Sequence, residues 1–101
     1  MVHIKIMMKE NNLGYHFNVE VVDTNGSISN HRVTMDRDFV TRIGAVYKPE
    51  KVIEKSFEFL LSKEQKESIL AEFDVTTISQ HFPDYISTLE KLLQNEPSRD
   101  I

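Results

Sequence analysis

Apolar and polar positions alternate through the first part of the chain. The apolar positions fall into two segments, namely Val2, Ile4, Ile6 and Met8, and then Tyr15, Phe17, Val19 and Val21. This period of two is typical of strands with one buried side, so we predict two β-strands joined by a turn at residues 10–14. Opposed residue numbers in an antiparallel pair have a constant sum. A sum of 23, which opposes Ile6 to Phe17, brings both apolar sides together.

A third strand is predicted over residues 29–35, after an Asn-Gly pair at positions 25 and 26. This pair is typical of a two-residue hairpin turn, but such a turn would oppose Val19 to Arg32. One more residue in the loop opposes Val19 to Val33 and keeps the apolar sides together. We therefore predict an odd-length loop or a bulge near residues 25–27.

From residue 36 onward the apolar spacing becomes helical. Residues 36–44 predict a short helix with Asp36 at its N-terminus and Gly44 at its end. A longer helix begins at Pro49 and runs to about Ser62. The apolar positions of these two helices are Phe39, Val40, Ile43, Val52, Ile53, Phe57, Leu60 and Leu61.

A third helical segment is predicted around Ile69, Leu70 and Phe73. The last apolar positions keep helical spacing across a proline: Ile78, Phe82, Tyr85, Ile86, Leu89, Leu92 and Leu93. Pro83 lacks the amide that a continuous helix needs, and it disfavours helical geometry at the residue before it. We therefore predict a kink or two abutting helices at this point.

The stretch around this proline, Gln80-His81-Phe82-Pro83-Asp84-Tyr85, has the residue types of a functional site. The helical spacing favours a structural role instead. We expect Phe82 and Tyr85 to be buried against Phe57 and Leu60, and His81 to face solvent or to cap the preceding turn.

Strands followed by helices predict an α+β fold. We expect one domain over residues 1–95, in which three to four helices pack on a three-stranded antiparallel meander. Residues 96–101 are expected to form a frayed tail. A length of 101 residues agrees with one domain.

Composition narrows the functional classes. The net charge is −4, which offers no general attraction for nucleic acid or for an anionic membrane. Cysteine is absent, which excludes disulfides, thiolate metal sites and a cysteine nucleophile. No stretch approaches the roughly 20 apolar residues of a membrane span, and the first residues lack the apolar run of a signal peptide. We expect a cytoplasmic protein.

The four histidines of the chain raise the question of a metal site. His3 and His16 fall on the polar side of the predicted sheet but about 13 Å apart, given the usual strand rise. His31 falls on the opposite side. We therefore expect no metal site, and we interpret His3, Glu20 and Arg32 as a row of exposed cross-strand pairs.

Catalytic motifs are also missing from the sequence. It contains no nucleophile elbow, phosphate-binding loop, dinucleotide fingerprint or His-Glu-x-x-His motif. We expect neither enzymatic activity nor a cofactor.

Residues 31–55 carry an excess of positive charge, and a strand, a short helix and a longer helix are predicted there in that order. This order loosely resembles a ribbon-helix-helix module, in which a dimer reads the DNA major groove with strand side chains. The nucleic-acid-binding residues under this alternative would be Arg32, Arg37, Lys48, Lys51 and Lys55. Against it, the strand already has a hairpin partner in its own chain, and the first helix is short. A mixed-charge solvated surface is the interpretation we favour.

A three-stranded sheet leaves at least one edge open to another chain. Phe59 and Tyr47 could add an apolar surface for a partner, although we favour a place in the core for both. We therefore expect a small non-enzymatic protein that acts by self-association or by protein–protein interaction through the exposed sheet edge. A ribbon-helix-helix-like, antitoxin-type nucleic-acid binder is the alternative.

Three further segments carry a resemblance to a known family: Ser-Phe-Glu-Phe-Leu-Leu at 56–61, Ser-Ile-Leu-Ala-Glu-Phe-Asp-Val at 68–75, and Ile-Ser-Gln-His-Phe-Pro-Asp-Tyr at 78–85. Together they resemble the recurring core of a family of small uncharacterised bacterial proteins, over roughly residues 31–86. That family has a proline just after the Phe-Leu-Leu segment, where this chain has Ser-Lys-Glu-Gln at 62–65. The preceding helix could therefore continue, or a new helix could begin at this capping-box spacing. The resemblance implies no activity and no functional residues.

Overall fold

The computed structural model describes residues 2–43 and 47–94. A four-stranded sheet forms one layer, made of β1 (His3–Glu10), β2 (Gly14–Val22), β3 (Ile28–Asp36) and β4 (Glu72–Asp74). The strands lie in the order β1-β2-β3-β4, and the first two pairs are antiparallel. β4 lies parallel to β3, because the chain passes through helices before it returns to the sheet.

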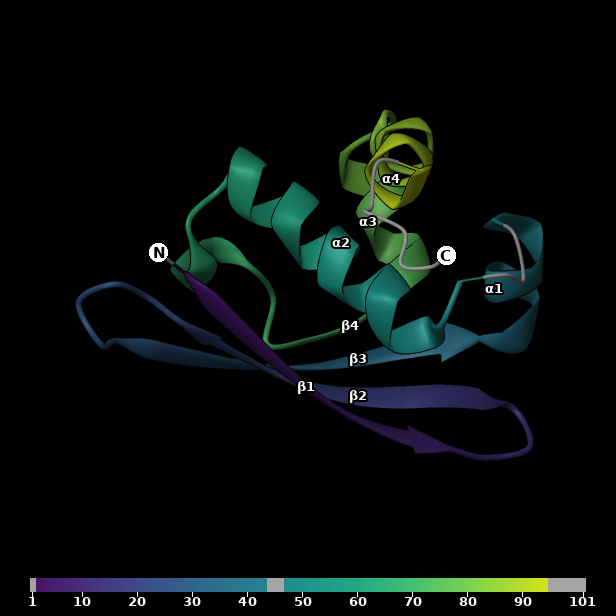
Figure 1. Cartoon of the computed structure of the whole chain (residues 1–101), viewed down its shortest axis with the longest axis horizontal. Helices are drawn as coiled ribbons and strands as arrows, with labels where there is room; N and C mark the ends of the chain where they lie inside the picture. The colour runs from purple at the N-terminus through teal and green to yellow at the C-terminus, as the bar shows by residue number, and fades with distance from the viewer. Residues whose placement is uncertain (1, 44–46, 95–101) are drawn as a thin grey trace, which may run out of the picture.

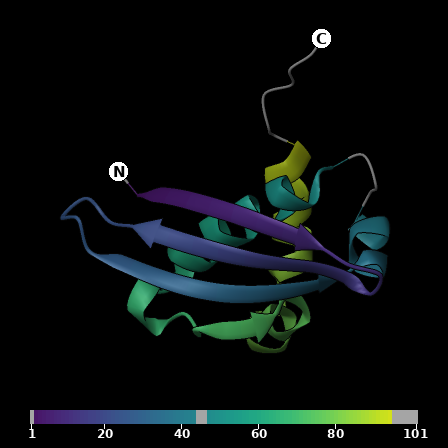
Figure 2. The same cartoon turned by 90° about the horizontal axis from the view of Figure 1, so that it is seen from below.

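The helices form the second layer, on one face of the sheet (Figure 1). Their bounds are α1 (Arg37–Ile43), α2 (Pro49–Lys63), the short 3₁₀ helix η1 (Lys66–Ser68), α3 (Val75–His81) and α4 (Tyr85–Gln94). None of the described helices lies on the opposite face of the sheet (Figure 2). The predicted α+β class is therefore confirmed. Among residues 2–43 and 47–94, no helix has both the length and the apolar character needed to cross a membrane.

The hairpin of β1 and β2 keeps the predicted apolar side, but its register is offset from the prediction by two residues. Ile6 opposes Val19, and Ile4 opposes Val21, which gives a sum of 25. The turn is longer than predicted because the side chain of Asn11 organises it. Asn11 Oδ1 accepts from the amides of Leu13 and Gly14, at 2.9 and 3.0 Å. An offset of two leaves the same side chains facing the helices, so the apolar pattern could not distinguish the two registers.

The loop between β2 and β3 has odd length, as predicted, and spans residues 23–27. The predicted pairs are again wrong by two positions, since Val19 opposes His31 instead of Val33. Hydrogen bonds within the loop set its length. The amides of Asp23 and Gly26 donate to the carbonyls of Ser27 and Asp23, each at 2.9 Å.

The predicted helix around residues 69–73 is wrong, and the predicted count of three strands is wrong with it. After α2 the chain forms η1 and then β4, where Phe73 opposes Val33. The amide of Arg32 donates to the carbonyl of Ala71 at 2.7 Å, just before the strand begins. A three-residue strand is too short to show a period of two, so its apolar residues looked helical. The capping-box segment neither extends α2 past Lys63 nor begins an α-helix.

The two last helices are separate, which is one of the two arrangements predicted at Pro83. Tyr85 is buried, as predicted, but Phe82 is only half-buried. Both rings pack against Phe59, whose ring centroid lies 5.4 Å from that of Tyr85 and 5.7 Å from that of Phe82. The predicted place of Phe59 in the core is confirmed, and Tyr47 packs half-buried against the same core. The predicted tail at residues 96–101 and the helix end at Gly44 lie outside the described residues.

Candidate functional site

The five basic residues of the nucleic-acid alternative do not share one side of the fold. Arg32 is exposed on β3, and its neighbours Val33 and His31 are buried toward the helices, so Arg32 faces away from them. Lys51 and Lys55 lie on α2, on the helical side of the sheet. The five residues are therefore divided between the two layers.

Four of these cations lie beside carboxylates. Arg32 is 3.5 Å from Glu72, and Arg37 is 2.8 Å from Glu10. Two lysines of α2 pair along the helix, Lys51 with Glu54 at 2.9 Å and Lys55 with Glu58 at 3.3 Å. Lys48 is the residue that precedes α2. Neighbouring carboxylates weaken the positive field that a phosphate backbone requires.

The position of β3 also bears on the ribbon-helix-helix alternative. In such a module the strand pairs with the same strand of a second copy. Here β2 occupies one edge of β3, and β4 occupies the other at Arg32, Val33 and Thr34. β3 therefore has no free edge over these central residues.

The histidines do not converge in the fold. His31 is buried and lies between Ser29 Oγ and the carbonyl of Leu70, each 2.8 Å from a ring nitrogen. The bond to Leu70 attaches the segment before β4 to the sheet, and the ring of His31 also packs against Phe57 of α2. Within the described residues, no three histidine, aspartate or glutamate side chains gather in a way that could hold a metal ion.

The predicted row of His3, Glu20 and Arg32 is replaced by other pairs, because the register is offset by two residues. Glu20 opposes Lys5, and the two charged groups lie 3.7 Å apart. Arg32 opposes Asn18 on one side and Glu72 on the other. The pairs are exposed, so each contributes only about 0.2–1 kcal/mol.

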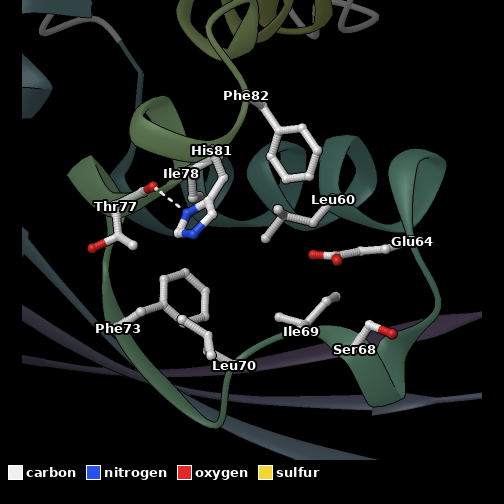
Figure 3. A pocket seen from close by; sticks show the side chains of 10 residues that line it. All are labelled: Leu60, Glu64, Ser68, Ile69, Leu70, Phe73, Thr77, Ile78, His81 and Phe82. Atoms are coloured by element: carbon white, nitrogen blue, oxygen red, sulfur yellow. Dashed lines mark hydrogen bonds between the residues drawn. The ribbon is translucent and has the colours of Figure 1, made fainter.

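A hollow lies between α2, α3 and the segment that connects η1 to β4 (Figure 3). We call it the α2–α3 hollow, and its volume is about 170 Å³. Apolar side chains make most of its wall, and the residues that line it are Leu60, Glu64, Ser68, Ile69, Leu70, Phe73, Thr77, Ile78, His81 and Phe82. The side chain of Leu70 stays 54% exposed at its rim, although it is apolar.

Two polar groups enter the α2–α3 hollow from opposite sides. The carboxylate of Glu64 extends into it from the end of α2, and the imidazole of His81 faces it from α3 (Figure 3). His81 Nδ1 lies 3.2 Å from the carbonyl of Thr77, which can only accept a hydrogen bond. The neutral ring therefore carries its proton on Nδ1 and presents Nε2 as an acceptor. His81 is exposed and contacts the preceding turn, as predicted.

The carboxylate of Glu64 has no partner among the described residues. The two nearest lysines in the sequence are engaged elsewhere: Lys63 lies 3.3 Å from Asp84, and Lys66 pairs with Glu67. The lining of the hollow contains no lysine or arginine. The hollow is thus an apolar space whose two principal polar groups are an anion and a hydrogen-bond acceptor.

The second candidate site is the edge of the sheet at β1. The order of strands leaves one side of β1 without a described strand, over eight residues. Its inward side chains, Ile4, Ile6 and Met8, pack against the core but are only partly buried. On its outer side Met7 is 69% exposed. Exposed apolar side chains along an unpaired edge strand are typical of strands that pair with another chain.

The sequence indicated the open edge but missed the α2–α3 hollow. Its wall depends on β4 and on the separation of α3 from α4, and the sequence pattern predicted a helix where β4 lies. Glu64 was interpreted as part of a possible capping box. The available signal was the group of apolar residues Ile69, Leu70 and Phe73, which belongs to neither a clear period of two nor a long helical pattern.

Comparison of the chain with protein-family models, with curated proteins and with solved structures gives no match. Function is therefore inferred from the geometry of the sheet edge and of the hollow.

Proposed function

We propose that this protein is a non-enzymatic association module that pairs with a second copy of itself along β1. The observation that carries the proposal is the incomplete cover of Ile4, Ile6 and Met8 on an eight-residue edge strand. A second copy of the strand would extend the sheet and cover these side chains. Two identical edges give a self-complementary, two-fold interface, which is the commonest form of soluble oligomer.

The hairpin determines which backbone groups of β1 are free for a partner. The amide of Asn11 donates to the carbonyl of Gly14 at 2.9 Å, so these two residues form a hydrogen-bonded pair. Hydrogen-bonded and non-bonded pairs alternate along an antiparallel ladder. The odd-numbered residues of β1 therefore direct their backbone groups to β2. Ile4, Ile6 and Met8 direct theirs outward, toward a second strand.

Side-chain charges then select one register for the pair. When two copies of β1 pair antiparallel, the numbers of two opposed residues must add to an even number. Only then do the apolar side chains of both copies lie on the same face of the extended sheet. A sum of 14 opposes Lys5 to Lys9, which places like charges together. A sum of 12 opposes Ile6 to its own copy, Ile4 to Met8, and Met7 to Lys5. Both sums match the outward backbone groups, since each opposes even-numbered residues to one another. We propose the register with a sum of 12, because it avoids the lysine pair.

The experiment is sedimentation equilibrium of the whole chain and of two charge variants at Met7. Met7→Lys would place a lysine opposite Lys5 of the second copy, and we expect weaker dimerisation. Met7→Glu would oppose a carboxylate to the same lysine, and we expect dimerisation at least as strong as in the parent chain. A cross-strand pair between residue 7 and Lys5 should change the free energy of dimerisation by about 0.2–1 kcal/mol, and the dimer contains this pair twice.

Leu13→Lys is the matched control. Leu13 is 84% exposed in the turn after β1, so the same lysine is added outside the proposed interface. Its dimerisation should equal that of the parent chain. A parent chain that is monomeric at every concentration, or two Met7 variants with equal dissociation constants, would contradict the proposal. Binding of duplex DNA that weakens with added salt would favour the ribbon-helix-helix alternative instead.

A further inference from the structure

We propose that the α2–α3 hollow binds a small organic cation, namely a primary amine carried on a compact apolar body. The hollow is separate from β1, so this site does not depend on the proposed self-association. Its apolar wall, its size and the polarity of its two inward groups each restrict the ligand, and together they select this class.

The wall favours an apolar ligand body. Leu60, Ile69 and Ile78 present aliphatic side chains, and Phe73 and Phe82 present two aromatic rings (Figure 3). The exposed part of Leu70 at the rim would also lose contact with water when a ligand enters. Apolar area removed from water is the main source of affinity in such a site.

The volume restricts the size of the body. The hollow measures about 170 Å³, whereas pockets that enclose drug-sized ligands measure about 300–1,000 Å³. A single phenyl ring or a short branched alkyl group with a short stem suits this space, and a nucleotide or a polycyclic cofactor does not.

The inward polar groups favour a positive head. Glu64 is half-buried and contributes a carboxylate that no described residue neutralises. His81 contributes Nε2 as an acceptor while Nδ1–H is directed to the carbonyl of Thr77. A carboxylate and a neutral imidazole nitrogen both require a donor, and an ammonium group supplies three. An anionic head would instead meet the charge of Glu64 with no cation in the lining to offset it.

The experiment is a titration of the ¹⁵N-labelled whole chain, followed by amide chemical shifts. The probes are phenethylamine and phenylacetate, which have similar apolar bodies and opposite charges. We expect phenethylamine to shift the amides around Leu70, Phe73 and His81. We expect phenylacetate to bind at least about tenfold more weakly, since a hydrogen bond to a charged group is lost and a repulsion is gained.

Two substitutions at Glu64 test the role of the carboxylate. Glu64→Gln keeps the shape of the side chain and should lower the affinity for phenethylamine about tenfold. Glu64→Lys places the protein's own ammonium group there and should reverse the preference in favour of phenylacetate. Glu90→Gln is the matched control, because Glu90 is exposed on α4 and does not line the hollow. Its affinity for phenethylamine should be unchanged.

Three results would overturn the proposal. The first is equal affinity for the two probes, and the second is an affinity for phenethylamine that Glu64→Gln does not change. The third is a set of shifted amides spread over residues that do not line the hollow. Thermal unfolding of each variant without ligand shows that an altered affinity is not a loss of fold. The charge variants at Met7 should leave phenethylamine binding intact, which separates this outcome from that of the β1 proposal.

Discussion

The phenol oxygen of Tyr85 lies 2.6 Å from Ser56 Oγ, and this hydrogen bond joins α4 to α2 inside the core. Ser56 also donates its single proton to the carbonyl of Val52, at 2.7 Å. Tyr85 must therefore be the donor in the bond between the two hydroxyl groups. Burial raises the pKa of the Tyr85 phenol far above its ordinary value of 10.0, so the phenol keeps the proton that it donates.

Tyr85→Phe should lower the free energy of unfolding by about 1 kcal/mol. The ring and its packing remain, but Ser56 loses the donor to its oxygen. Ser56→Ala should be more costly, at about 1–3 kcal/mol, because it leaves the buried phenol proton without an acceptor. Urea unfolding of both variants and of the double variant measures the difference. A Tyr85→Phe variant as stable as the parent chain would contradict the role of this bond.

The sequence predicted the elements that have a long, regular pattern. β1, β2 and β3 were expected from their period of two, and α2 from Pro49 and its apolar spacing. The registers were each wrong by two residues, because an offset of two preserves the side that each residue faces. The turns decide between such registers through single side chains, such as Asn11, whose hydrogen bonds to the backbone the apolar pattern does not encode.

Gly14 shows how closely the backbone approaches itself at the start of β2. A Cβ atom at this position would lie 2.4 Å from the carbonyl oxygen of Met35 in β3. Because the opposing atom belongs to the backbone of a paired strand, it cannot move without opening the ladder. Gly14→Ala should therefore destabilise the protein by about 1–3 kcal/mol, the usual cost of inserting atoms into a packed interior.

Thermal unfolding is the measurement for Gly14→Ala, and Leu13→Ala is the control. Leu13 lies in the same turn but is 84% exposed, so its truncation should change the free energy of unfolding by less than about 0.5 kcal/mol. Equal stability of the two variants would mean that the strands can separate at this point without cost.

The candidate site was harder to predict than the fold, and the reason lies in β4. Three residues, Glu72 to Asp74, have no periodicity of their own, and their strand exists because β3 offers an edge. The α2–α3 hollow forms only when this strand holds Phe73 on the sheet while α3 departs from it. Glu64 lies at the C-terminal end of α2, where its amide donates to the carbonyl of Leu60, and no sequence motif marks it as part of a site.

The carboxyl group of Asp74 connects β4 to β3 and to α3. We expect it to make the free energy of unfolding depend on pH in the acidic range. Partial burial raises the pKa of its carboxyl group, but hydrogen bonds from Thr34 Oγ1 and from the hydroxyl and amide of Thr76 outweigh this, and the pKa lies below its ordinary value of 3.8. A carboxyl group with a lowered pKa in the folded state stabilises the fold above its ordinary pKa. This contribution disappears as the pH falls through the lower, folded value.

Thr34→Val tests this contribution, because it removes one donor to Asp74 and keeps the shape of the side chain. Its free energy of unfolding should be lower than that of the parent chain near pH 6, by about 1.5–3 kcal/mol for a bond to a charged group. The difference should shrink as the pH falls from 3.8 through the lower pKa of Asp74 in the folded state, where its carboxyl group becomes protonated. Urea unfolding at pH 6 and at pH 2.5 measures both differences. A difference that is the same at the two pH values would mean that the charge of Asp74 is not involved.

Phe82 is less buried than the sequence pattern predicted. The helical spacing predicted a fully buried ring, for which truncation to alanine would cost about 3–5 kcal/mol. The ring is instead half-buried at the wall of the hollow, where it meets Phe59 edge to face at 5.7 Å. Part of its area is already in contact with water, and the space left by its removal is open to solvent.

We therefore expect Phe82→Ala to lower the free energy of unfolding by about 1.5–3 kcal/mol, less than a fully buried ring would. Tyr85→Ala is the comparison, since Tyr85 contacts the same Phe59 but is fully buried, and its cost should be larger. Urea unfolding of both variants under one set of conditions gives the ranking. If Phe82→Ala costs as much as Tyr85→Ala, the ring is held in the core and the hollow is closed in solution. A loss below about 1 kcal/mol would mean that the ring contributes little to the fold, and that its main contact is with whatever occupies the hollow.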